Sequence, residues 1–125
     1  ENSVFVRHRD RPTELFHRLR DNPAFRERFA SRVRLHLTGD GVLTPAQAAA
    51  RYERHAEILE SAILAESARW GDYRATVHPY RTGPYDRYTP KNHWETERRR
   101  LMTEYFPKRT EILLDQYRNA GLYPQ

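Results

Sequence analysis

Residues 44–72 have the sequence TPAQAAARYERHAEILESAILAESARWGD, and this stretch decides the fold. Thr44 and Pro45 are residue types that begin helices, and Gly71 is a type that ends them. Between these signals, apolar residues recur three, four or seven positions apart. They are Tyr52, Ala56, Leu59, Ile63 and Trp70. The spacing predicts one long helix with a single buried stripe.

Glu66 falls on the same stripe, between Ile63 and Trp70. Because a buried carboxylate is unstable unless it is paired or hydrogen-bonded, we expect Glu66 to bind a cation or an N–H donor. The candidate partners are Arg32, Arg69 and Trp70. Two roles are open. We favour a structural ion pair that fixes how the helices pack; the alternative is an acid, base or ligand group in a cleft.

Composition indicates a polar globular chain. The 125 residues are enough for one domain with its own core, and 31% of them are charged while 38% are hydrophobic. We expect a charged linker over residues 1–11 and a single helical domain over 12–125. No apolar run is long enough to span a membrane. The absence of cysteine excludes disulfides and thiolate metal sites.

Basic residues exceed acidic ones, 22 against 17, and most of them are arginine. Arginine pairs well with phosphate, but acidic residues alternate with the arginines, which is typical of solvated helix faces with internal ion pairs. We therefore do not expect nucleic acid as a partner. The run Arg98, Arg99 and Arg100 is a candidate site for an anion or a partner, with a solvated helix face as the alternative.

Two further helices are predicted before the long one. A short helix begins near Thr13, and a second one starts after the cap Asn22, with Pro23 in its first position. The second helix carries an apolar ridge with a four-residue repeat, made of Phe25, Phe29, Val33 and Leu37.

Two more helices are predicted after it. Asn92 is expected to cap one whose inward residues are Trp94, Leu101, Met102 and Tyr105. After a break at 106–107, Pro107 is expected to open the last helix, which buries Ile112, Leu113, Tyr117 and Ala120. Gly121 is expected to end it in a left-handed conformation, and residues 122–124 to fold back. The predicted fold is an all-α bundle of four main helices plus a short N-terminal one.

Residues 72–92 lose the helical pattern and predict a long irregular loop rich in tyrosine, arginine and proline. Its candidate binding residues are Tyr80, Tyr85 and Tyr88, since tyrosines among arginines can stack on bases or sugars. The alternative is a loop that wraps the helices and covers core surface, and we favour it.

Sequence motifs of catalysis are missing from the chain. The glycines are scattered, so there is no phosphate-binding loop, and no two histidines stand four apart on one predicted helix. No histidine stands at a sequence spacing from Ser61 or Ser67 that would indicate activation of the serine hydroxyl. We expect no catalytic residue, no metal and no cofactor in this chain.

Three stretches together resemble a known family. They are LFHRL at 15–19 with NPAFR at 22–26, ESARWGD at 66–72, and the C-terminal part from Trp94 through FPKRT at 106–110 to GLYP at 121–124. The first stretch also includes FASR at 29–32. The pattern resembles the C-terminal helical region of the spore-coat CotH kinase-like family, in its multidomain bacterial branch. The resemblance covers nearly all of the chain after residue 11, and its most specific part is ARWG at 68–71.

The resemblance implies a parent protein that uses ATP and Mg to transfer phosphoryl groups to serines of secreted or coat proteins. The lysine and the acidic motif that bind nucleotide and metal in that family precede the matched region, so no position here takes a catalytic role. The resemblance also implies an exported or cell-surface parent.

Two functions are therefore open. The first is a non-catalytic subdomain that braces the C-lobe of the parent kinase or borders its substrate groove, with the upstream kinase-like lobe as its partner. The second is a stand-alone interaction module for an anionic polymer or a protein partner.

Overall fold

The computed structural model describes residues 12–77 and 85–124, and every regular element in these ranges is helical. The expected all-α class, with four main helices and a short leading one, is confirmed. The predicted linker over 1–11 lies outside the described residues. In chain order the elements are α1 (Pro12–Leu19), α2 (Pro23–Leu37), α3 (Pro45–Trp70), the π-helical turns η2 (Tyr73–Val77) and η3 (Pro90–Trp94), α4 (Glu95–Arg100), the π-helical turn η4 (Leu101–Tyr105) and α5 (Phe106–Asn119).

The described residues form two compact units. Of the described residues, the first unit contains 12–48 and 107–124, and the second contains 49–77 and 85–106. Helix α3 therefore begins in the first unit and continues in the second. The expectation of a single helical domain over 12–125 stays a prediction.

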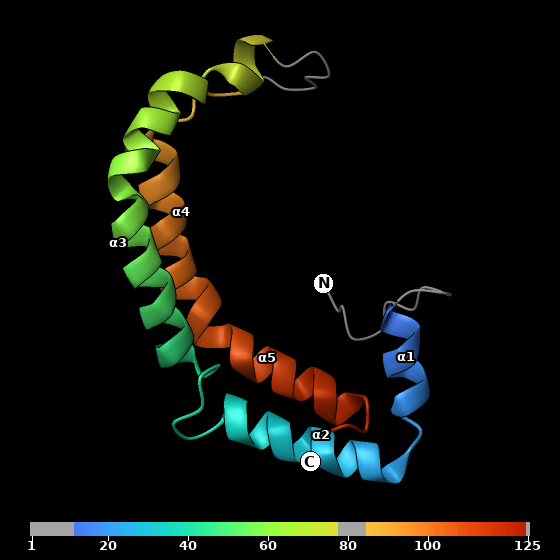
Figure 1. The fold of residues 1–125 in the computed structure, drawn as a ribbon. Helices are drawn as coiled ribbons and strands as arrows, with labels where there is room; N and C mark the ends of the chain where they lie inside the picture. Colours follow the sequence, from blue (N-terminus) through green and yellow to red (C-terminus); the bar gives the residue numbers. More distant parts are fainter. Residues whose placement is uncertain (1–11, 78–84, 125) are drawn as a thin grey trace. The chain divides into compact units, whose positions relative to one another are not determined.

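The core of the first unit lies between α2 and α5, which run side by side in Figure 1. Val33, Leu37 and Leu114 are its buried centre. Four partly buried residues pack around them: Phe29, Leu113, Tyr117 and Tyr123. The predicted ridge on α2 is confirmed at its C-terminal half. On α5 the prediction was partly wrong, because Leu114 is buried whereas Ile112 is 47% exposed.

Local signals fix the ends of these helices. The Asn22 side chain accepts hydrogen bonds from the backbone N–H groups of Ala24 and Phe25 at 2.9 and 3.3 Å, which confirms the predicted cap of α2. At the other end, Gly121 adopts a φ of 68°, as predicted for a left-handed cap. The Leu122 N–H then donates to the Tyr117 carbonyl at 2.9 Å, so the chain folds back as expected.

The second unit pairs α3 with the segment η3–α4–η4, and the two run side by side in Figure 1. Ala56 is buried, and the Tyr52 ring packs on Phe106 with centroids 5.3 Å apart. The predicted stripe is only partly buried, since Leu59 and Trp70 are 50% and 49% exposed. A single helix partner covers a narrower face than the sequence pattern implied.

The region predicted as an irregular loop contains two π-helical turns. One, η2, follows α3 directly; the other, η3, begins at Pro90. The cap is Thr89 and not Asn92, because the Asn92 N–H donates to the Thr89 hydroxyl at 3.2 Å. The pair Thr89-Pro90 repeats the helix-start signal of Thr44-Pro45, in which a threonine is followed by a proline at the first helical position.

The predicted break at 106–107 is instead a change of hydrogen-bond register. The Phe106 N–H donates to Leu101 O, five residues back, while φ and ψ of −60° and −41° keep Phe106 helical. Pro107 has no N–H to donate to the carbonyl four residues earlier. Because the turn η4 uses hydrogen bonds to the fifth preceding residue, the backbone stays helical at Pro107. Helix α5 accordingly begins at Phe106.

Leu122 carries the first prediction, since it is 2% exposed. Leu122→Ala should lower the free energy of unfolding by about 2–5 kcal/mol, because it leaves a cavity under the C-terminal turn. Urea denaturation followed by circular dichroism measures this. Leu15→Ala, at a position 63% exposed, is the control and should cost less than about 0.5 kcal/mol. Equal losses in the two variants would contradict the described core.

Candidate functional site

The structure does not bury Glu66, so the expected buried ion pair is wrong. Glu66 is exposed, and Arg32 is exposed on α2 in the other unit. Within the described ranges neither side chain makes a hydrogen bond or an ion pair. Residues of α3 are turned about 100° from one to the next, and the partly buried neighbour Ser67 occupies the inner position instead. Of the other candidate partners, Arg69 lies over the Trp70 ring, 4.9 Å from its centroid.

Glu66 and Trp70 nevertheless share one site with residues from η3 and α4. They border a groove of about 650 Å³ whose lining is mainly apolar. We call it the aromatic groove. Its rings are Trp70, Tyr88, His93 and Trp94, its aliphatic wall is Ile63, and its polar groups include Glu66, Asn92 and Glu97. A groove of this size accommodates a few side chains or a small ligand.

Gly71 creates this groove by letting two backbone segments approach each other. The Tyr88 N–H donates to Gly71 O at 2.7 Å, and the Gly71 N–H donates to Ser67 O at 3.0 Å. A Cβ at Gly71 would overlap both Ser67 O and Tyr88 O. The Tyr88 ring then packs on His93, with centroids 5.0 Å apart. The ARWG sequence therefore has a structural role, which is to end α3 and hold Tyr88 beside it.

Substitution of Gly71 tests this close approach. Gly71→Ala should lower the free energy of unfolding by about 1–3 kcal/mol, because the added methyl group forces the Gly71 and Tyr88 backbones apart. Asp72→Ala, at the exposed next position, is the control and should cost less than about 0.5 kcal/mol. Chemical denaturation of the two variants measures the difference. A Gly71→Ala variant as stable as the control would contradict the described turn.

The three arginines of the predicted anion site do not act together. Arg98 forms a two-pronged ion pair with Glu53 and lies over the Trp94 ring, 5.3 Å from its centroid. Arg100 forms a similar pair with Glu97, with Nε and Oε2 2.8 Å apart. Only Arg99 has no ion pair within the described ranges. Two of the three positive charges are therefore already compensated.

The tyrosines of the predicted binding loop also have separate roles. Tyr88 lines the aromatic groove, while the hydroxyl of Tyr85 accepts a hydrogen bond from Arg74 at 2.8 Å. The Arg74 guanidinium also lies over the Tyr85 ring, 4.6 Å from its centroid. Tyr80 lies outside the described residues.

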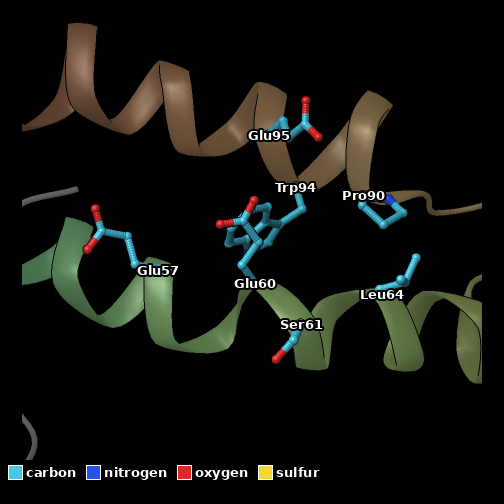
Figure 2. A pocket seen from close by; sticks show the side chains of 7 residues that line it. All are labelled: Glu57, Glu60, Ser61, Leu64, Pro90, Trp94 and Glu95. Atoms are coloured by element: carbon cyan, nitrogen blue, oxygen red, sulfur yellow. The ribbon is translucent and has the colours of Figure 1, made fainter.

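A smaller hollow is also lined by Trp94, and Figure 2 shows it from close by. Its volume is about 490 Å³. We call it the acidic hollow, because Glu57 and Glu60 project from α3 and Glu95 from α4, while Trp94 extends toward α3. None of these glutamates has an ion pair in the described part of the chain. The site therefore joins apolar rings to carboxylates that make no direct ion pair, although the charges of Glu57 and Glu60 act on Arg98.

Arg98 and Glu53 provide the strongest electrostatic contact here. The hydrogen bonds from Arg98 lower the pKa of Glu53, and the same bonds raise the pKa of Arg98. The charges of Glu60 and Glu57 raise the pKa of Arg98 further. This guanidinium shows how a cation binds between carboxylates and the Trp94 ring.

The pKa of Glu53 gives a pH prediction. A carboxyl group whose pKa is lower in the folded state stabilises the fold above its unfolded pKa, and this contribution is lost as the pH falls through the folded value. Glu53→Gln should therefore be less stable than the parent at neutral pH, and the difference should shrink as the pH falls below the ordinary glutamate range. Thermal melts from neutral to acidic pH measure it. A pH-independent difference would contradict the ion pair.

Sequence reasoning missed the acidic hollow and most of the groove. Glu53, Glu57 and Glu60 follow the i, i+4, i+7 spacing of one helix face, so part of the signal was visible. Tyr88 and His93 could not be placed beside Trp70 from local pattern alone. Their proximity depends on the Gly71 turn.

No group of three or more His, Cys, Asp or Glu side chains in residues 12–77 and 85–124 could hold a metal ion. In the same ranges, no helix has the length and apolar character needed to cross a bilayer. Comparison with models of protein families, with curated proteins and with solved structures finds no significant match.

Proposed function

We propose that this chain is a non-catalytic helical subdomain that packs against the kinase-like lobe of a CotH-like protein. In this proposal the parent transfers phosphoryl groups from MgATP, and the helices brace its C-lobe or border its substrate groove. The resemblance of residues 15–32, 66–72, 94–110 and 121–124 to that family supports the identity of the lobe.

The observation that carries the proposal is an apolar face of α3 that the described residues of the second unit leave exposed. Ile58, Ala62 and Ala65 follow the i, i+4, i+7 spacing, and all three are exposed, Ile58 by 68%. We call them the outer face of α3. At about 100° per residue they lie opposite Ala56 and Ile63, which are turned toward the neighbouring helix. A helix that is apolar on two sides is typical of one covered on both.

The rival function of binding an anionic polymer has less support. Arg98 and Arg100 are compensated by carboxylates, and Glu57, Glu60 and Glu95 lie next to them in space or sequence. These negative charges would repel a polyanion. A protein partner fits the apolar outer face better.

The proposal predicts that Ile58→Glu acts only when the kinase-like lobe is present. In the chain alone the change should alter the free energy of unfolding by less than about 0.5 kcal/mol, since the position is solvent-exposed. In a chain extended upstream to include the lobe, it should cost more than about 2 kcal/mol, because it buries an unpaired charge. Thermal melts of both proteins measure this.

Leu35→Glu is the matched control, at an α2 position 58% exposed. It should leave both proteins within about 0.5 kcal/mol of their parents. MgATP should raise the melting temperature of the extended protein and leave that of the chain alone unchanged. The proposal fails if MgATP stabilises the chain alone, or if the extended protein tolerates Ile58→Glu.

A further inference from the structure

We infer that the aromatic groove and the acidic hollow together bind a basic segment of a protein partner, in which an apolar side chain is flanked by arginine or lysine. The apolar side chain enters the aromatic groove, and the flanking cations bind the carboxylates around it. This site uses the side of α3 that faces η3 and α4, so it does not depend on the proposed function, which concerns the outer face.

The aromatic groove supplies an anchor site for an apolar or cationic side chain. Trp70 and Tyr88 are 49% and 44% exposed, so their rings are available at the groove. Trp94 lines both the groove and the acidic hollow. Ring faces attract ammonium and guanidinium groups that lie within about 6 Å, and they also pack well on aliphatic chains.

The charge of this surface selects a cationic partner. The chain has a net charge of +5, yet the residues lining the two hollows include five glutamates and no arginine or lysine. They are Glu57, Glu60, Glu66, Glu95 and Glu97. Of these five glutamates, only Glu97 has an ion pair in the described residues, and its partner is Arg100. Glu57 and Glu60 act on Arg98 through their charge. Four of the five carboxylates nevertheless make no direct ion pair in the described residues, so they can bind a cation from outside.

Arg98 already demonstrates the chemistry inside this chain. It binds Glu53 through two nitrogens while its guanidinium covers the Trp94 ring at 5.3 Å. A guanidinium from outside can bind in the same manner in the acidic hollow, which Trp94 also lines and where Glu57, Glu60 and Glu95 make no ion pair in the described residues. Bidentate pairing and ring stacking together favour arginine over lysine.

A peptide titration tests the inference on the chain as it is. The probe is an acetylated, amidated heptapeptide with a central leucine flanked by arginines, and its matched control replaces every arginine with neutral citrulline. Tryptophan fluorescence follows binding, since both tryptophans line the groove. We expect the arginine peptide to bind at least about tenfold more tightly and to weaken with salt. Equal affinity for the citrulline peptide, or tighter binding of a glutamate analogue, would overturn the inference.

Two variants locate the site. Glu60→Gln and Glu66→Gln combined should weaken the arginine peptide about three- to tenfold, as expected for the loss of two exposed ion pairs. Both residues are exposed, so the fold should be retained. Glu27→Gln, exposed on α2, should leave the affinity unchanged. Equal affinities in the parent and the double variant would overturn the inference.

A second copy of this arginine-rich chain could also occupy the aromatic groove and the acidic hollow, and a further measurement distinguishes it from a separate partner. Sedimentation equilibrium at the concentrations of the titration should show a monomer that binds one peptide. A dimer that the Glu60→Gln, Glu66→Gln double variant dissociates would assign the surface to self-association and overturn the inference of a separate partner.

Discussion

The contact between Gly71 and Tyr88 is the constraint on which the second unit depends. The Tyr88 N–H reaches Gly71 O only because position 71 has no Cβ, and this contact returns the chain to the end of α3. From there Thr89 and Pro90 start the helical segment that runs back along α3. The aromatic groove is a by-product of this turn, since the turn brings Tyr88 and His93 to the same site as Trp70.

The N-terminal end of α2 and the C-terminal end of α5 were predictable because they depend on local hydrogen bonds. The Asn22 cap and the Gly121 turn require only neighbouring residues, so composition and spacing were sufficient. The π-helical turns were not predictable in the same way. In η4 the hydrogen bond moves from the fourth to the fifth preceding residue, and this change leaves no mark in the apolar pattern. On α5, Leu114 is buried and Ile112 is exposed, because burial there depends on how α5 packs against α2.

The candidate site was only partly predictable because burial depends on what packs opposite a residue. Glu66 and Trp70 were singled out correctly as neighbours on one helix, and both line the groove. The inferred environment was wrong, since η3 and α4 cover only a narrow face of α3 and leave Glu66 exposed. Tyr88 and His93 meet Trp70 through a turn about twenty residues after it in the chain, and helical periodicity does not report such a contact.

The carboxylates beside Trp94 have a kinetic consequence as well. A negative patch on a chain of net charge +5 gives the molecule an uneven electric field. A basic body that diffuses toward it is repelled by the net positive charge of the chain and attracted by this patch, so its approach is oriented before any contact forms. Collisions in other orientations are less often productive. The surface around Trp94 would thereby govern how fast a partner is captured, and added salt would slow that capture more than it speeds release.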